Sequence, residues 1–141
     1  MKLISLVLWF IAATPVSIGI GNTHALQIEI DNIKSNKGHL IIAIFDSKEN
    51  FLEEDIFNKS IAVTGATSMR IDVALPEGEY SVAVFHDTNK NGELDKNMFG
   101  WPQEAFGFSK KSMGLIGPPS FRDTKFTIPA TSRVKVALKH L

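Results

Sequence analysis

Oxygen-bearing side chains recur at alternate positions in the segment Asp87-Thr-Asn-Lys-Asn-Gly-Glu-Leu-Asp95. Counted from its first residue, aspartate or asparagine stands at positions 1, 3, 5 and 9, and glycine stands at position 6. This is most of the spacing with which a loop wraps calcium, because alternate side chains converge and glycine permits the sharp turn. We therefore expect calcium as a cofactor. The expected ligands are the side chains of Asp87, Asn89, Asn91 and Asp95 and the main-chain carbonyl of Glu93.

The twelfth position of this loop is Met98, where a calcium loop usually carries a bidentate glutamate. We expect Glu104 to close the coordination shell from the following loop and to tie that loop to the end of the strand. Two asparagines in place of aspartates reduce the ligand charge, which predicts affinity in the millimolar to submillimolar range. The alternative is a solvated turn without an ion, since Asn, Asp and Gly are ordinary turn residues.

A histidine directly precedes this loop and suggests a second chemistry. A hydrolase using His86, Asp87 and Glu104 is the alternative function, with or without a metal. A catalytic metal needs further histidines or carboxylates around an open position. After residue 25 the chain has only His39 and His140 besides His86, one at the start of an expected strand and one near the C-terminus. We therefore favour a supporting hydrogen-bond role for His86 and assign no catalytic residue.

Residues 97–121 form a long segment without strand periodicity that is rich in aromatic residues, proline and glycine. A loop this long and this apolar is expected to be ordered and either packed down or functional. Four of its aromatic side chains make a possible platform for a glycan or an apolar ligand, the alternative being burial against one end of the fold. They are Phe99, Trp101, Phe106 and Phe108.

Alternation of apolar and polar residues predicts strands in much of the rest of the chain, and a continuous apolar run rich in β-branched residues predicts a central strand at 39–45. The expected strands are 26–33, 39–45, 60–64, 69–75, 80–85, 125–128 and 133–138, with a short helix or turn at 48–57. Short strands separated by turn signals are typical of an all-β protein. We expect an antiparallel β-sandwich of about seven strands, with residues 26–141 as a single domain and 97–121 as its one long loop.

The first 25 residues are typical of a secretory signal peptide. Lys2 gives the charged start, Leu3 to Ala13 are apolar, Pro15 breaks the run, and Thr23-His24-Ala25 supplies a cleavage site. An uncleaved anchor is the rival interpretation, since Leu3 to Ile20 is mostly apolar and about long enough to span a bilayer. With cleavage, no transmembrane segment remains, and the protein is expected in the periplasm or outside the cell.

Composition limits the partners and the covalent chemistry. The 141 residues include 15 basic and 15 acidic side chains and no cysteine. Removal of residues 1–25 takes away one lysine and leaves a net charge of −1. A nearly neutral chain argues against nucleic acid as a partner, because nucleic-acid binding needs a basic face. Without cysteine there is no disulfide, so a bound ion would be a local substitute for one.

Several motifs resemble the family of exported bacterial proteins catalogued as domain of unknown function 2141. The motifs are Leu75-Pro-Glu-Gly-Glu-Tyr80, His86-Asp-Thr-Asn-Lys-Asn-Gly-Glu-Leu-Asp95, Phe99-Gly-Trp-Pro-Gln-Glu104, Phe106-Gly-Phe-Ser109 and Gly117-Pro-Pro-Ser-Phe121. The resemblance implies a transthyretin-like or prealbumin-like sandwich and an exported location. It implies no reaction. Trp101 stands where an aliphatic residue is more usual in this pattern.

The sequence thus favours an exported β-sandwich module that binds a ligand or a cell-envelope partner and has a calcium-stabilised loop. The alternatives are the hydrolase and a purely structural assembly domain whose exposed sheet edge pairs with a partner. The oligomeric state is left open.

Overall fold

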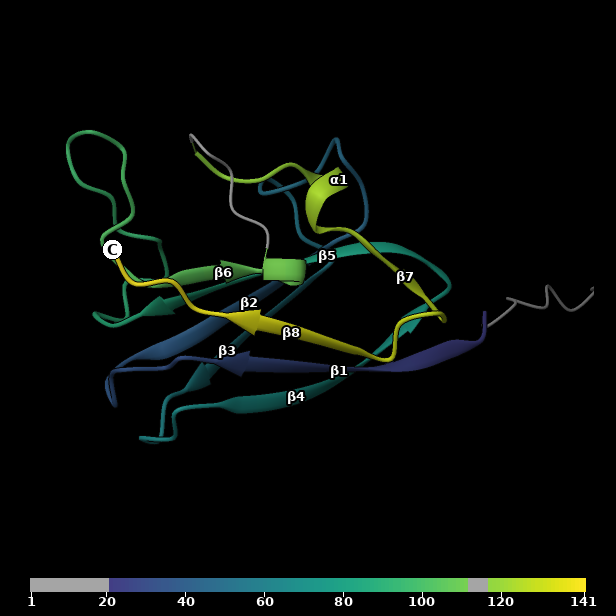
Figure 1. Cartoon of the computed structure of the whole chain (residues 1–141), viewed down its shortest axis with the longest axis horizontal. Helices are drawn as coiled ribbons and strands as arrows, with labels where there is room; N and C mark the ends of the chain where they lie inside the picture. Colours follow the sequence, from purple (N-terminus) through teal and green to yellow (C-terminus); the bar gives the residue numbers. More distant parts are fainter. Residues whose placement is uncertain (1–20, 112–116) are drawn as a thin grey trace, which may run out of the picture.

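The computed structural model of the chain describes residues 21–111 and 117–141 and consists of two packed β-sheets. The three-stranded sheet has the order β4-β1-β8 (Figure 1), with bounds Thr23–Asp31 for β1, Met69–Pro76 for β4 and Arg133–Ala137 for β8. The larger sheet has the order β3-β2-β5-β6, and β7 also pairs with β5. Its bounds are His39–Phe45 for β2, Phe57–Ala62 for β3, Gly78–Asp87 for β5, Phe106–Phe108 for β6 and Phe126–Ile128 for β7.

The prediction of an all-β sandwich is confirmed, and residues 21–111 and 117–141 contain eight strands in place of about seven. The added strand is β6, which lies inside the expected loop 97–121 and pairs with β5. All strand pairs are antiparallel except β1 with β8, which run parallel. Helix is confined among the described residues to η1 (Ser109–Lys111) and α1 (Phe121–Thr124). None of these helical segments has the length and hydropathy needed to cross a membrane.

Other sequence boundaries differ only locally from the structure. The segment expected as a short helix or turn is a turn, in which Glu53 and Glu54 donate their backbone N–H groups to the carbonyl of Asn50. The strand expected at 60–64 begins at Phe57, because its ladder to β2 extends to the pair Ile44 and Phe57.

Residues 1–20, which hold most of the expected signal peptide, lie outside the described residues, as do residues 112–116 of the long loop. The expected cleavage site at Thr23–Ala25 lies within β1, where it pairs with Ala74–Pro76 of β4. Signal cleavage stays a prediction.

The core lies between the two sheets and is built from alternate residues of each strand. Because successive strand side chains point to opposite faces, one apolar residue in two enters the core. The fully buried aliphatic residues are Leu26, Ile28, Ile30, Leu40, Ile42, Ile44, Val82, Val84, Ile128, Val136 and Leu138. Burial of each such side chain contributes roughly 1.5–3 kcal/mol before the entropy of ordering is counted.

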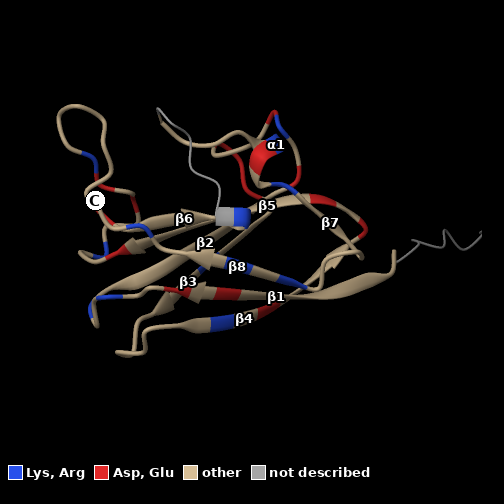
Figure 2. Cartoon of the chain, in the orientation of Figure 1, with Lys and Arg blue, Asp and Glu red and all other residues tan. Residues whose placement is uncertain are grey.

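The outer face of the three-stranded sheet is charged. Glu29 of β1 pairs with Arg70 of β4 at 3.5 Å and with Lys135 of β8 at 3.9 Å. Lys135 also pairs with Asp31 at 3.1 Å, and the hydrogen bond to this carboxylate raises the pKa of the Lys135 ammonium. Figure 2 shows these alternating charges along β4, β1 and β8. This face is therefore a solvent-facing surface.

The outer face of the larger sheet is apolar over β2, β5 and β6. Ile41 and Ala43 of β2 lie beside Phe85 and Ala83 of β5, each pair directly opposite in the ladder. Phe106 of β6 continues the row on the far side of Phe85. All five side chains are partly exposed. The two outer faces of this sandwich thus have opposite character, and the candidate site lies on the apolar one.

Candidate functional site

The acidic loop begins where β5 ends. Both carboxylate oxygens of Asp87 accept backbone hydrogen bonds from the loop, Oδ1 from Asn91 at 3.1 Å and Oδ2 from Gly92 at 2.8 Å. Gly92 has φ of 78°, a left-handed conformation that glycine adopts without a steric penalty. Asp87 is buried. The first residue of the predicted calcium motif thus fixes the turn at its sixth position.

The side chains of the other predicted ligands lie together around Asp95. The amide groups of Asn89 and Asn91 both donate to the carboxylate of Asp95, Asn91 at 2.7 Å. The amide oxygen of Asn89 accepts from the N–H of Asn91 at 3.2 Å, and that of Asn91 accepts from the N–H of Glu93 at 3.0 Å. The alternate spacing seen in the sequence therefore brings positions 3, 5 and 9 into contact.

Glu104 connects this loop to the chain that follows. Its Oε1 accepts from the backbone N–H of Thr88 at 2.9 Å and from the Thr88 hydroxyl at 3.2 Å. Its Oε2 accepts from the backbone N–H of Asp95 at 3.2 Å. Glu104 is only 7% exposed, and a buried carboxylate is costly unless hydrogen bonds compensate its charge. The three donors supply this compensation. It thus ties both ends of the loop together through the backbone.

A metal shell that includes Glu104 stays a prediction. Within residues 21–111 and 117–141, no three His, Asp or Glu side chains gather as a metal-holding group. The predicted ligand side chains that do meet are those of Asn89, Asn91 and Asp95, whereas the Asp87 carboxylate contacts backbone N–H groups of the same loop.

His86 faces the opposite side of β5 from Asp87. It is 1% exposed, and its Nε2 is hydrogen-bonded to the carbonyl of Lys37 at 2.7 Å. Four cavities of about 340 to 600 Å³ among the described residues are not lined by His86, Asp87 or Glu104. The hydrogen bond gives His86 a structural partner, and the hydrolase alternative stays a prediction.

A groove of about 600 Å³ lies over the apolar outer face of the larger sheet. Its floor is the row described above, formed by Ile41, Ala43, Ala83, Phe85 and Phe106. One wall comes from the acidic loop and the segment after it, through Leu94, Trp101 and Pro102. Charged residues at the rim are Asp55, Glu93, Lys96 and Lys139.

An aromatic cluster closes one end of this groove. The ring of Phe51 contacts those of Phe45, Phe121 and Phe108, with centroids 5.5, 5.9 and 6.3 Å apart. Phe45 and Phe108 also line the groove. Such edge-to-face and tilted contacts are favourable for aromatic pairs. Among the described residues, one part of the apolar sheet face is thus covered and the adjacent part is open.

The four predicted platform aromatics have different positions. Phe108 is buried and Phe106 is partly buried, and both line the groove together with Trp101, which is 52% exposed. Phe99 is 79% exposed and lines neither this groove nor the cleft beside it. The structure therefore brings three of the four to one cavity and places Phe99 outside it.

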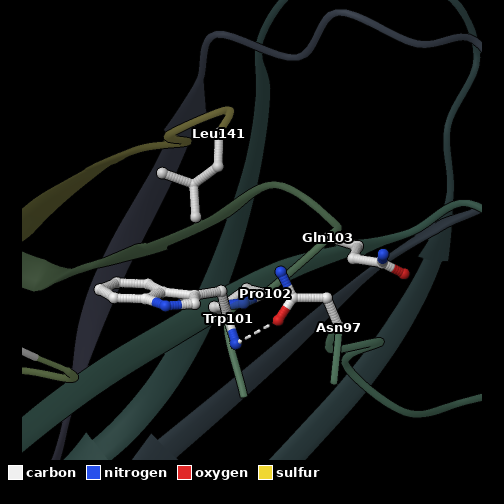
Figure 3. A pocket seen from close by; sticks show the side chains of 5 residues that line it. All are labelled: Asn97, Trp101, Pro102, Gln103 and Leu141. Carbon is white, nitrogen blue, oxygen red and sulfur yellow. Dashed lines mark hydrogen bonds between the residues drawn. The ribbon is translucent and has the colours of Figure 1, made fainter. Parts of the chain in front are cut away.

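An open cleft of about 530 Å³ lies on the other side of Trp101. Leu141, at the C-terminal end, points toward Trp101 and Pro102 across this cleft (Figure 3). The side-chain oxygen of Asn97 accepts a hydrogen bond from the backbone N–H of Trp101 at 3.1 Å. Trp101 is thus shared by the cleft and the groove.

A family model described as "Uncharacterized protein conserved in bacteria (DUF2141)" matches residues 28–136, which run from β1 to β8. The chain belongs to the DUF2141 family. The match includes both the acidic loop and the residues that form the groove floor. No curated protein and no solved structure matches the chain. The transthyretin-like arrangement implied by the resemblance stays a prediction.

Sequence reasoning missed the floor of the groove in this DUF2141 protein. The runs at 39–45 and 80–85 are apolar at nearly every position, and this pattern predicts a central strand at 39–45 and a further strand at 80–85 without indicating a groove. Ile41, Ala43, Ala83 and Phe85 are the positions of these runs that face away from the core. The signal was present, because apolar residues on both faces of a strand require a cover on both faces.

Proposed function

We propose that this protein is an exported binding module whose groove on the larger sheet takes a ligand with an apolar body. The apolar outer face of β2, β5 and β6 is the observation that carries this proposal. An exposed sheet face in a sandwich normally alternates to polar residues, as the opposite sheet does here with Glu29, Arg70 and Lys135. Export is supported by the sequence of residues 1–25.

The size and lining of the groove fit a small molecule. Ligand pockets span roughly 300–1,000 Å³ and combine an apolar lining with a few polar groups. The groove of about 600 Å³ has aliphatic and aromatic residues on its floor and four charged residues at its rim. Contact between the groove floor and the apolar part of a ligand would remove both of these surfaces from water. This burial favours binding by about 25 cal/mol per Å² of apolar surface buried.

A fluorescent probe tests the groove directly. N-phenyl-1-naphthylamine is neutral and apolar and becomes emissive when it leaves water. We expect saturable binding to the native protein and its loss in Ala83→Trp, because the indole would fill the floor beside Phe106 and Phe108. The matched control is Ala74→Trp, the same change at an exposed position of β4 on the charged sheet.

Binding that is equal in Ala83→Trp and Ala74→Trp would overturn the groove proposal, as would a signal that does not saturate. Thermal melts of both variants, with melting temperatures close to the native value, establish that each is folded. Both proteins are then produced in a bacterium that exports them and are compared by native mass spectrometry. A ligand of the groove should copurify with the native protein and not with Ala83→Trp.

We also propose that the loop 87–95 binds calcium. The donor set consists of oxygens only, as Ca²⁺ prefers. Asn89 and Asn91 already contact the carboxylate of Asp95, so rotation of their two amide groups would present oxygens to an ion beside it. Asp87 carries the second charge of the set, and its carboxylate keeps lone pairs beyond the two backbone hydrogen bonds.

Thermal unfolding in calcium and in chelator tests the ion site. With a dissociation constant of about 0.1 mM, about 1 mM calcium stabilises the folded state by roughly 1.4 kcal/mol. For a domain of this size the melting temperature should rise by several degrees. Asp87→Ala should lose that rise, and Asp72→Ala, on the exposed face of β4, should keep it. An unchanged melt in calcium, or the same rise in Asp87→Ala, would rule out the site.

A further inference from the structure

A narrow turn at residues 96–102 presents large apolar side chains to solvent. Met98 is 91% exposed, Phe99 is 79% exposed and Trp101 is 52% exposed. The base of the turn is closed by a β-bridge between Lys96 and Pro102. In Figure 1 this green loop stands away from the two sheets, beside the C-terminus. We call residues 96–102 the apolar tip.

Four backbone N–H groups of the apolar tip are hydrogen-bonded within the turn. The side-chain oxygen of Asn97 accepts from the N–H groups of Phe99 at 2.9 Å and Trp101 at 3.1 Å. The N–H of Asn97 donates to the carbonyl of Trp101 at 2.8 Å, and that of Gly100 donates to the carbonyl of Asn97 at 2.9 Å. These four groups can leave water without losing a hydrogen bond, which lowers the cost of moving the tip into a medium of low polarity.

We propose that the apolar tip inserts into the interfacial region of a lipid bilayer. The tip is convex and consists of a few side chains, which suits a fluid interface that closes around it. Tryptophan, phenylalanine and methionine are side chains that favour this region, and an amphipathic indole is stable at the level of the headgroups. Leu141, 67% exposed and beside Trp101, extends the apolar surface.

Two lysines near the tip can contact anionic headgroups. Lys96 lies at the base of the turn, and Lys139 lines the same groove from the C-terminal segment. Neither lysine forms an ion pair with another residue in the described part of the chain. Glu93 and Asp55 are the acidic residues at the rim of the groove. Two lysines close to the surface strengthen attraction to a negatively charged leaflet.

This inference is independent of the groove proposal, because Met98 and Phe99 line neither the groove nor the cleft. Phe99→Ser therefore tests membrane contact alone, and Ala83→Trp tests the groove alone. Failure of one leaves the other standing.

The emission of Trp101 reports the position of the tip. The chain has two tryptophans, Trp9 and Trp101, so a Trp9→Phe background makes Trp101 the single reporter. The protein is purified with its N-terminus defined by mass spectrometry and mixed with vesicles of phosphatidylcholine alone or with an equal part of phosphatidylglycerol. We expect a blue shift, quenching by lipids brominated in their acyl chains, and tighter partitioning into the anionic vesicles.

Phe99→Ser should weaken partitioning by about tenfold, since burial of a phenylalanine side chain from water contributes roughly 1.5–3 kcal/mol. The matched control is Ile56→Ser, another exposed large apolar residue, which should partition as the parent does. Lys96→Gln should reduce partitioning into the anionic vesicles and leave the neutral ones unchanged.

Three results would overturn the inference. The first is no blue shift with either vesicle, and the second is equal partitioning of Phe99→Ser and the parent protein. The third is a blue shift that grows with protein concentration in the absence of lipid, which would assign the tip to contact between protein molecules.

Discussion

Thr88 donates both its backbone N–H and its hydroxyl to Oε1 of Glu104, over 2.9 and 3.2 Å. Because Thr88 directly follows β5, this pair fixes the end of the strand to the segment that leads into β6. The neighbouring residues of the two segments are also joined through the backbone, since the N–H of His86 donates to the carbonyl of Ala105 at 2.8 Å. The acidic loop and the wall of the groove are therefore held as one unit.

Glu104→Ala should lower the free energy of unfolding by about 2–3 kcal/mol, because three donors would lose a buried charged acceptor. Glu104→Gln should lose less, since one amide oxygen still accepts. Denaturant titration measures both values. Glu53→Ala, an exposed glutamate whose side chain forms no hydrogen bond within the described residues, is the control and should change stability by less than about 0.5 kcal/mol. Native stability in Glu104→Ala would contradict the role given to this carboxylate.

Gly107→Ala should destabilise the fold by about 1–3 kcal/mol through overpacking. A Cβ at this position would lie 2.6 Å from the carbonyl oxygen of Ala137 and 2.9 Å from Val136, so β6 and β8 would have to separate. Gly78→Ala is the control, because its Cβ would meet only the Tyr80 side chain, at 3.3 Å or more. Urea unfolding compares the two variants. Equal unfolding free energies for the two variants would show that β6 can move away from β8 without loss of stability.

Tyr80 should make stability fall in alkaline solution. Burial, and then the nearby charge of Asp46, raises the pKa of the Tyr80 phenol, whose hydroxyl donates to the carbonyl of Pro76 at 3.0 Å. Ionisation is thus easier in the unfolded chain. The protonated phenol therefore contributes to the free energy of unfolding below the unfolded pKa of about 10, and this contribution is lost as pH rises through the folded pKa.

Tyr80 is the single tyrosine, so ultraviolet absorbance of the tyrosinate measures its titration directly. Tyr80→Phe should unfold with a weaker dependence on alkaline pH than the native protein. A titration of Tyr80 at the ordinary tyrosine pKa in the folded protein would contradict this expectation.

Asn97→Ala should loosen the apolar tip with little effect on the rest of the fold. The variant loses the acceptor for the N–H groups of Phe99 and Trp101, so hydrogen exchange of these two amides should accelerate at least tenfold. The global unfolding free energy should change by less than about 1 kcal/mol, because the tip lies outside the core. Asn36→Ala, at an exposed turn, is the control and should leave both amides unchanged. Unaltered exchange in Asn97→Ala would show that the side chain does not order the tip.

Alternation alone was enough to predict β4, which was expected at 69–75 and runs over Met69–Pro76. Its buried residues Ile71, Val73 and Leu75 follow the period of two that a half-buried strand requires. Alternation was not enough for β6, whose three residues Phe106–Phe108 carry too short a pattern. That strand exists because β5 offers it an edge.

The acidic loop shows the same division. The spacing of Asn89, Asn91 and Asp95 is local, so contact among them follows from a single turn of the chain and was foreseeable. The role of Glu104 was expected to be that of an ion ligand. Its contacts with the backbone N–H groups of Thr88 and Asp95 depend on the position of β6, and the local sequence pattern does not predict that position.

The sequence by itself determined the strands, their buried faces and the turn that gathers the oxygen ligands, because each follows from interactions between residues near one another in the chain. Only the tertiary structure decided that one outer sheet face is an open apolar groove. The apolar positions of β2 and β5 are visible in the sequence, but what covers them depends on distant segments. Phe51 and Phe121 cover one part of that face, and the position of Trp101 leaves the next part accessible.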